Sequence, residues 1–295
     1  MKIGLIGTGR LGGGIVERLI NIGHDVFIWN RSPEKTRHLV ELGATLMASP
    51  AQVVEAAEII LSVLTDAQAI EAAYSGPNGV LSASLRGKVC IEMSTVRPET
   101  QIALAAKVIS AGGEFVECPV GGSVMPAKEG ALLGLVGGEA SSVEKILPLL
   151  RQMCRRVEHV GAVGSGSSLK LAINLPLLVY WESLSEAIAL AEPIGIDPER
   201  LLDILADTSG APNVMKARAP KIAAALKSGK PGATFFNIDS IRKDLQTMIE
   251  EGKSLGYSLP VAQAALSSFD RSSAAGYGAS DGSELVTSWL AIAKK

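Results

Sequence analysis

A lysine and an asparagine stand four residues apart in an otherwise apolar stretch of the chain. Residues 164–181 read GSGSSLKLAINLPLLVYW, in which Lys170 and Asn174 are this pair. On a helix, residues i and i+4 share one face. An unpaired ammonium removed from water costs several kcal/mol or changes its protonation state, so either Lys170 extends out of the core or a site requires it. In an apolar site, a lysine can move a proton to or from an oxygen as a general acid or base.

The first residues of the chain contain a glycine-rich loop of the kind that binds dinucleotides. The stretch GTGRLG has the spacing G-x-G-x-x-G, follows an apolar run typical of a strand and precedes a helical segment. The first glycine permits a tight turn, the second lets the backbone approach a pyrophosphate, and the third allows close packing of helix and strand. The free N–H groups of the helix N-terminus then face the phosphates. The residues expected to bind the cofactor here are Gly7, Thr8, Gly9, Arg10, Leu11 and Gly12.

The residues after the second predicted strand favour a cofactor with a 2′-phosphate. A protein that binds NAD places an Asp or Glu about 20 residues after the loop, where it binds the ribose 2′-hydroxyl. This chain has Asn30, Arg31 and Ser32 at that place. A 2′-phosphate meets no carboxylate there, and a guanidinium, a hydroxyl and an amide can bind it. The sequence therefore predicts NADP(H) in preference to NAD(H).

Composition and charge exclude several other classes of function. The 295 residues include 28 basic and 30 acidic side chains without a basic run, so nothing favours binding to nucleic acid or to an anionic membrane. Three cysteines and three histidines are scattered without a metal-binding motif, which predicts free thiols in a reducing compartment and no metal. The chain starts with a strand-like segment, and no uninterrupted apolar run approaches ~20 residues. We therefore expect a cytoplasmic protein without a membrane span.

The elements that must position these residues fall into two groups. Short β-branched runs alternate with helical segments up to about residue 161, which predicts a doubly wound parallel sheet of the Rossmann type. Long segments rich in alanine and leucine follow and predict an all-helical half. We expect an α/β domain at 1–162 and a helical domain at 163–295, with a cleft between them. The predicted strands are 3–7, 25–30, 58–63, 88–93, 114–119 and 131–138, and Ile102, Ala105, Ala106 and Ile109 share one face of the helical segment 98–113.

Five motifs in chain order resemble the β-hydroxyacid dehydrogenase family, which includes 3-hydroxyisobutyrate dehydrogenase, tartronate semialdehyde reductase and glyoxylate/succinic semialdehyde reductase. They are GTGRLG with NRS, EMSTVRPET, ECPVGGSVMPAKEGAL, GSGSSLKLAIN and RKDL, and together they cover the whole chain. The resemblance implies an NADPH-dependent oxidoreductase that transfers a hydride between the nicotinamide and a small β-hydroxyacid, semialdehyde or keto acid. In the family's pattern the lysine at position 170 is the general acid/base, and the asparagine at 174 orients lysine and substrate.

The resemblance also implies roles for residues outside this pair, and a homodimer or homotetramer formed through the helical domain. At 119–123 the family pattern is Pro-Val-Ser-Gly-Gly, whereas this chain has Pro-Val-Gly-Gly-Ser. The missing hydroxyl at Gly121 removes a donor to the substrate carboxylate and leaves room for a bulkier substrate. The further residues implied to bind the cofactor are Leu64, Thr65, Thr95 and Lys243, and those implied to bind substrate are Ser94, Gly121, Gly122, Ser123 and Asn213.

Two alternative functions stay open at this point. Imine reductases resemble the same architecture but usually have an aspartate or a tyrosine where Lys170 stands, so the lysine favours carbonyl chemistry, while Gly121 keeps the imine alternative open. A non-catalytic NADP-binding scaffold would be expected to lose Lys170, Asn174, Thr95 and Lys243, which this chain retains. Separately, Pro176 inside the predicted helix predicts a kink that reshapes the pocket beyond Asn174.

Overall fold

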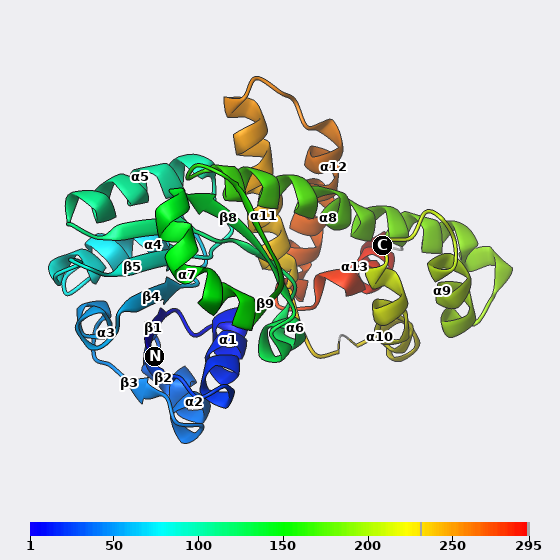
Figure 1. Cartoon of the computed structure of the whole chain (residues 1–295). Helices are drawn as coiled ribbons and strands as arrows, with labels where there is room; N and C mark the ends of the chain where they lie inside the picture. The colour runs from blue at the N-terminus through cyan, green and yellow to red at the C-terminus, as the bar shows by residue number, and fades with distance from the viewer. Residues whose placement is uncertain (231, 294–295) are drawn as a thin grey trace. The chain divides into compact units, whose positions relative to one another are not determined.

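The computed structural model describes residues 1–230 and 232–293, and the chain divides into two compact units, Met1–Lys170 and Leu171–Lys295. The first unit contains a sheet flanked by helices, and the second is helical (Figure 1). The strands of the first unit are β1 (Lys2–Ile6), β2 (Asp25–Trp29), β3 (Thr45–Leu46), β4 (Ile59–Ser62), β5 (Val89–Glu92), β6 (Glu114–Glu117), β7 (Val120–Gly121), β8 (Leu132–Gly138) and β9 (Cys154–Gly161). Its helices are α1 (Arg10–Asn21), α2 (Arg37–Glu41), α3 (Pro50–Ala56), α4 (Ala67–Ser75), α5 (Pro98–Ser110), α6 (Val124–Glu129) and α7 (Ala140–Met153), and α8 (Ser165–Ala191) begins in it.

The strand order of the sheet is β3-β2-β1-β4-β5-β6-β8-β7, with β9 paired to β8. Strands β1 to β6 pair in parallel, whereas β8 is antiparallel to β6 and β7 and parallel to β9. From β1 the chain winds outward to β2 and β3 on one side and then to β4, β5 and β6 on the other. The order therefore reverses at β1, and in sheets of this kind ligands bind beyond the carboxyl ends of the strands at that point. The predicted Rossmann-type α/β fold followed by helices is confirmed.

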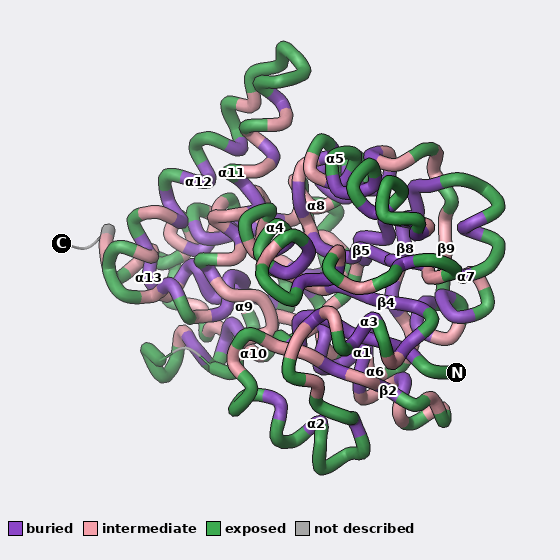
Figure 2. Tube along the Cα trace, turned by 90° about the vertical axis from the view of Figure 1, so that its left-hand side faces the viewer, coloured by how far each residue is buried: buried purple, intermediate pink, exposed green. Residues whose placement is uncertain are grey.

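Side chains of the central strands alternate between two hydrophobic cores, because successive residues of a strand point to opposite faces. Ile3 and Leu5 belong to a core shared with α1, α6 and α7 on one face. Ile6 and Ile60 belong to a core shared with α3, α4 and α5 on the other face. Figure 2 shows β4, β5 and β8 as buried segments between helices whose outer turns are exposed. The sheet is thus covered on both faces, and its carboxyl edge carries the loops discussed below.

Some elements differ from those that the sequence predicts. The pattern misses β3 and β7, which have two residues each, and β9, whose sequence CRRVEHVG alternates poorly because it carries the charges of an edge strand. The antiparallel pairing of β8 also departs from the expected all-parallel sheet.

The apolar face expected on α5 is not the face that it buries. Ile102 and Ile109 are 53% and 58% exposed, whereas Leu104, Ala105 and Val108 are buried. Gln101 is buried as well, so one polar residue lies on the inner face of the helix. The face of α5 that packs against the sheet is therefore shifted by about one residue from the face that contains Ile102 and Ile109.

The second unit consists of helices around a core of its own. Besides most of α8, it contains α9 (Pro198–Ala206), α10 (Val214–Ser228), α11 (Ile238–Ser254), α12 (Pro260–Ser272) and α13 (Leu285–Ala293). Helix α13 reaches residue 293, and Lys294 and Lys295 lie outside the described residues. Helix α8 continues through Pro176 without interruption, and the predicted kink stays a prediction.

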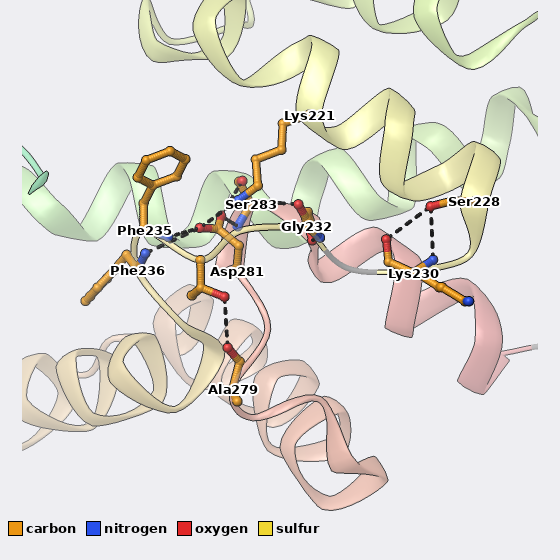
Figure 3. A network of polar contacts seen from close by, with 11 residues as sticks. Lys221, Ser228, Lys230, Gly232, Phe235, Phe236, Ala279, Asp281 and Ser283 are labelled. Atoms are coloured by element: carbon orange, nitrogen blue, oxygen red, sulfur yellow. Dashed lines mark hydrogen bonds and ion pairs between the residues drawn. The ribbon is translucent and has the colours of Figure 1, made fainter. Parts of the chain in front are cut away.

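A buried ion group fastens the segment that leads into α11 (Figure 3). Asp281 Oδ2 accepts hydrogen bonds from the backbone N–H groups of Phe235, at 2.6 Å, and Phe236, at 3.3 Å. The ammonium of Lys221 on α10 lies 3.0 Å from the same oxygen and 3.4 Å from Glu284 Oε1. The ring of Phe235 lies 4.8 Å from that ammonium, a distance suitable for a cation–π contact.

Candidate active site

The three glycines of the GTGRLG loop are required for different physical reasons. Gly7 has φ +94°, and a Cβ added there would lie 2.3 Å from the carbonyl oxygen of Val63. A Cβ on Gly12 would lie 2.1 Å from the carbonyl oxygen of Gly7. Gly9 is the N-cap residue of α1, and a Cβ added there would meet nothing within 4 Å. The protein's own packing explains Gly7 and Gly12, whereas open space at a helix N-terminus is what a pyrophosphate needs.

Asn30 joins this loop to the turn after β2. Its Oδ1 accepts a hydrogen bond from the backbone N–H of Thr8 at 3.3 Å, and its Nδ2 donates to the carbonyl oxygen of Ser32 at 2.9 Å. Thr8 is buried, and its hydroxyl has no hydrogen-bond partner among the described residues. Arg10 and Arg31 are exposed. Asn30 therefore holds the loop, while the unsatisfied hydroxyl of Thr8 and the exposed guanidinium of Arg31 fit a bound dinucleotide.

Hydrogen bonds connect the loops that follow β4 and β5. The backbone N–H of Leu64 donates to Ser94 Oγ at 2.7 Å, and the backbone N–H of Ser94 donates to Glu92 Oε1 at 2.6 Å. Ser62 Oγ donates to Glu92 Oε2 at 2.5 Å and lies 2.8 Å from the hydroxyl of Tyr74. These bonds fix Thr65, which is exposed, and Thr95, which is half-buried, at the carboxyl edge of the sheet.

Glu92 is the buried carboxylate of this group. It is fully buried, and burial raises its pKa to about 7, although hydrogen bonds from Ser62 and Ser94 act in the opposite direction. A carboxylate in this position is stabilised only by neutral donors, which explains the direction of the shift. Glu92, Ser62 and Tyr74 are not among the site residues predicted from the sequence. The feature of the sequence that could have indicated Glu92 is an acidic residue at the end of the otherwise apolar strand β5, VCIE.

The predicted substrate loop lies beside α1. Gly121 ends β7, which pairs with β8, and Ser123 is the N-cap residue of α6. Gly14 on α1 allows α6 to approach, because a Cβ there would lie 3.1 Å from Ala127 Cβ. Gly122 has φ +121°, and a Cβ on it would lie 2.8 Å from Leu132, so this position requires glycine. At Gly121 a Cβ would meet Leu133 at an ordinary contact distance of 3.4 Å.

The predicted catalytic lysine is the last residue of the first unit. Lys170 lies on α8 and is 6% exposed. The first turn of α8 is fastened to the sheet by Glu117 at the end of β6, whose carboxylate accepts hydrogen bonds from Gly164, Gly166 and Ser167. Lys170 is thereby attached to the same sheet as the predicted cofactor and substrate loops.

The other predicted residues belong to the second unit. Asn174 is half-buried on α8, one turn after Lys170, and Asn213 is exposed at the N-cap of α10. Lys243 on α11 is half-buried and pairs with the buried carboxylate of Asp244. The predicted residues from 7 to 170 thus belong to the first unit, and these three belong to the second.

A cavity of about 320 Å³ lies elsewhere in the first unit, between α7 and β9. Arg151, Arg155, Arg156 and His159 contribute to its lining, and none of the predicted site residues does. We place the candidate site at the carboxyl edge of the sheet because the residues there have the chemistry of dinucleotide binding. Within residues 1–230 and 232–293, no group of three or more His, Cys, Asp or Glu could hold a metal, and no helix is long and apolar enough to cross a membrane.

The fold and the loop geometry define a dinucleotide-binding domain of the Rossmann type. The family described as "NAD binding domain of 6-phosphogluconate dehydrogenase" matches residues 2–161. The family described as "NAD-binding of NADP-dependent 3-hydroxyisobutyrate dehydrogenase" matches residues 164–289. The chain belongs to the β-hydroxyacid dehydrogenase family, as the sequence motifs predict, and is an NAD(P)-dependent enzyme of the dehydrogenase and reductase class that acts on hydroxyl groups.

Two relatives and two solved structures illustrate the range of similar proteins. Glyoxylate/succinic semialdehyde reductase 1 of Arabidopsis thaliana is 33% identical, with 97% of each chain covered. Cytokine-like nuclear factor N-PAC of Anopheles gambiae is 31% identical over 96% of this chain, which spans 49% of that protein. A 3-hydroxyisobutyrate dehydrogenase from Salmonella typhimurium has a TM-score of 0.86 at 22% identity, with 97% and 99% of the chains covered. An imine reductase from Myxococcus stipitatus has a TM-score of 0.66 at 20% identity, with 98% and 100% covered, and both structures show the fold alone.

Proposed function

We propose that this protein is an NADPH-dependent reductase of a small semialdehyde or keto acid, or in the reverse direction a β-hydroxyacid dehydrogenase, with Lys170 as the general acid/base. The observation that carries the proposal is a lysine that is only 6% exposed on a helix whose first turn is bonded to the cofactor-side edge of the sheet. An ammonium sheltered from water in this way can supply a proton to a carbonyl oxygen or take one from a hydroxyl. Asn174, one turn further, orients the lysine and the substrate.

The cofactor supplies or accepts the hydride when it is bound, and the chain supplies its binding groups. Residues 1–162 hold it, through the open backbone at Gly9, the hydroxyl of Thr8, and the loops of Leu64, Thr65 and Thr95. Arg31 selects NADP(H), because its exposed guanidinium can bind a 2′-phosphate and none of residues 30–32 is the acid that binds a 2′-hydroxyl. Residues 163–295 contribute Asn174, Asn213 and Lys243 and the contacts of a homo-oligomer. Supporting this division, the two family matches meet between residues 161 and 164.

Replacement of Lys170 tests the catalytic proposal. Lys170→Met should lower kcat about 10²- to 10⁴-fold and leave the Kd of NADPH nearly unchanged, because a general acid/base acts in the chemical step. Lys216→Met is the matched control, since Lys216 is an exposed lysine 3.2 Å from Asp207, and it should keep wild-type kcat. Wild-type turnover in Lys170→Met would refute the assignment.

Replacement of Arg31 tests the cofactor preference. Arg31→Ala should weaken NADPH binding at least tenfold and change NADH binding less than twofold, because only NADPH carries the 2′-phosphate. Arg86→Ala is a suitable control, since Arg86 is an exposed arginine that precedes β5 at the amino edge of the sheet. An equal loss of both cofactors in Arg31→Ala would contradict the 2′-phosphate assignment.

A substrate panel separates the proposal from its two alternatives. NADPH oxidation is followed with glyoxylate, succinic semialdehyde, methylmalonate semialdehyde, tartronate semialdehyde and a cyclic imine, each with the wild type and Lys170→Met. We expect turnover of at least one carbonyl substrate that depends on Lys170. Turnover of the imine alone would favour imine reduction on the same fold, and NADPH binding without any turnover would favour a scaffold.

A further inference from the structure

A second buried carboxylate, Glu117, has no role in the proposed chemistry but is bonded to the catalytic helix. It ends β6 and is fully buried. Its Oε1 accepts hydrogen bonds from the backbone N–H groups of Gly164, at 2.6 Å, and Gly166, at 2.8 Å. Its Oε2 accepts one from Ser167 Oγ at 2.6 Å. A single side chain from the sheet therefore binds three polar groups within residues 164–167, where α8 begins.

The surrounding chain is shaped to receive this carboxylate. A Cβ on Gly137 of β8 would lie 2.3 Å from Glu117 Oε1, and a Cβ on Gly166 would lie 2.4 Å from the carbonyl oxygen of Leu135. Glycine at these two positions lets both the carboxylate and the first turn of α8 approach the strand closely. Replacing either glycine would require the backbone to move, because the atoms in the way belong to the main chain or to the buried acid.

Helix α8 depends on this contact because its own sequence supplies no equivalent. The first turn contains no acidic residue, although a negative charge there is favourable next to the N-terminal end of the helix dipole. The first N–H groups of a helix also need acceptors that the helix itself cannot provide. Glu117 provides both the charge and the acceptors from a position about 50 residues earlier in the chain.

The same residue is connected to the predicted reaction loops. Strand β6 runs directly from Glu117 into the segment 118–123, which contains the predicted substrate loop. On the neighbouring strand, Glu92 is the register partner of Glu117, and it accepts a hydrogen bond from the backbone N–H of Ser94, in the loop that carries the predicted cofactor residue Thr95. Lys170 follows Ser167 by three residues, or about 4.5 Å along the helix axis at 1.5 Å per residue.

We propose that Glu117 is a positioning residue that fixes Lys170 relative to the cofactor and substrate loops by binding the first turn of α8. The inference rests on the proposed function of Lys170. A displacement of about 1 Å can lower the rate of a reaction about 10²-fold even when the displaced group is not itself removed. Loosening the first turn of α8 should therefore reduce the rate of proton transfer and leave the binding of NADPH intact.

The test uses the isosteric variant Glu117→Gln, with Glu114→Gln as the matched control. Glu114 begins the same strand but pairs with Lys145 at 2.6 Å on a partly exposed face. Glu117→Gln should lower kcat about 10- to 100-fold, with KM for both substrates changed less than threefold, because the amide keeps the volume but loses the charge and one acceptor. Hydrogen exchange in the segment 162–170 should become faster in this variant and stay unchanged in Glu114→Gln.

A double variant shows whether Glu117 acts through Lys170. In the Lys170→Met background, Glu117→Gln should cause less than a twofold further loss of kcat, because the positioned group is absent. An additional loss as large as in the wild type would overturn the positioning role, and so would wild-type kcat in Glu117→Gln alone. Wild-type kcat in Lys170→Met would instead overturn the proposed function, and with it the positioning role, so the two failures are distinguishable.

Discussion

The buried acids of the two units are stabilised in different ways. In the first unit, Glu92 and Glu117 accept hydrogen bonds from serine hydroxyls and backbone N–H groups of loops at the carboxyl edge of the sheet. In the second unit, Asp281 and Glu284 lie beside the ammonium of Lys221 (Figure 3). Neutral donors hold loops in place but leave the carboxylate charge without a counter-ion. An ion pair holds a segment in place and also neutralises the charge. The first arrangement occurs next to the predicted site and the second fastens a structural segment.

Asp281 differs from Glu92 and Glu117 in the direction of its pKa shift, whereas burial raises the pKa of Glu284 as it does those of the two glutamates of the first unit. Burial raises the pKa values of Glu92 and Glu117 above the ordinary value, and their hydrogen bonds oppose this effect only in part. Burial also raises the pKa of Asp281, but the bonds from Ser283, Phe235 and Lys221 together outweigh it, so its pKa is lowered. A charge removed from water is therefore retained at Asp281 and disfavoured at the two glutamates.

The largest effect is expected where the ion pair is broken. Asp281→Ala leaves Lys221 without its 3.0 Å partner and leaves the N–H groups of Phe235 and Phe236 without their acceptor. Removing one member of a buried ion pair typically costs about 3–5 kcal/mol, so we expect the free energy of unfolding to fall by about that amount in urea titrations. Asp207→Ala, which removes the exposed partner of Lys216, should change it by less than about 1 kcal/mol. Equal losses in the two variants would show that the group around Asp281 behaves like a surface pair.

The next effect concerns pH. Because the folded-state pKa of Glu92 is raised from 4.5 to about 7, the folded chain binds more protons than the unfolded chain between these values. Stability from this group is fully present below about pH 4.5 and is lost as pH rises through about 7, by an amount on the order of 3 kcal/mol. Glu92→Gln should flatten this dependence in urea titrations at several pH values. An unchanged slope in the variant would assign the dependence to other groups.

Asp281 in the second unit should respond in the opposite direction. The lowered pKa of Asp281 means that its contribution is present at neutral pH and is lost as pH falls below its unfolded value of about 3.8. Hydrogen exchange resolved by segment can follow the two units separately. We expect segments around Asp281 to lose protection in acid and segments around Glu92 to lose protection as pH rises past about 7.

A smaller effect should separate residues that hold the fold from residues that face the ligand. Gly9→Ala introduces a methyl group where nothing lies within 4 Å, so the free energy of unfolding should change by about 1 kcal/mol or less. NADPH should nevertheless bind at least tenfold more weakly, because the methyl group occupies the approach of the pyrophosphate. Gly12→Ala should destabilise the fold itself, since its Cβ would lie 2.1 Å from a backbone oxygen. Unchanged NADPH binding in Gly9→Ala would contradict the assignment of the loop.

Sequence patterns predict those features of the fold and the site that are determined by residues close together in the chain. The glycine loop, the alternation of strands and helices, and the lysine in an apolar run are all visible within windows of about ten residues. The contact of Glu117 with Gly164 joins residues 47 positions apart, and no local pattern shows it. The buried face of α5 also depends on the sheet beneath it, so Ile102 looks like a core residue in the sequence and is exposed in the structure.

The smallest effect on stability is expected at Gly121 in the predicted substrate loop. Gly121, like Gly9, has room for a Cβ, whereas Gly122, like Gly12, does not. Gly121→Ser places its Cβ 3.4 Å from Leu133 without a positive φ, so stability should change by less than about 0.5 kcal/mol. If the substrate carries a carboxylate, the new hydroxyl can donate to it, and a hydrogen bond of about 0.5–1.5 kcal/mol corresponds to a fall in KM of about two- to tenfold. Gly122→Ser should instead destabilise the protein, because Gly122 has φ +121° and its Cβ would lie 2.8 Å from Leu132. A rise in KM for carboxylate substrates in Gly121→Ser would indicate that Gly121 makes room for a bulkier group there.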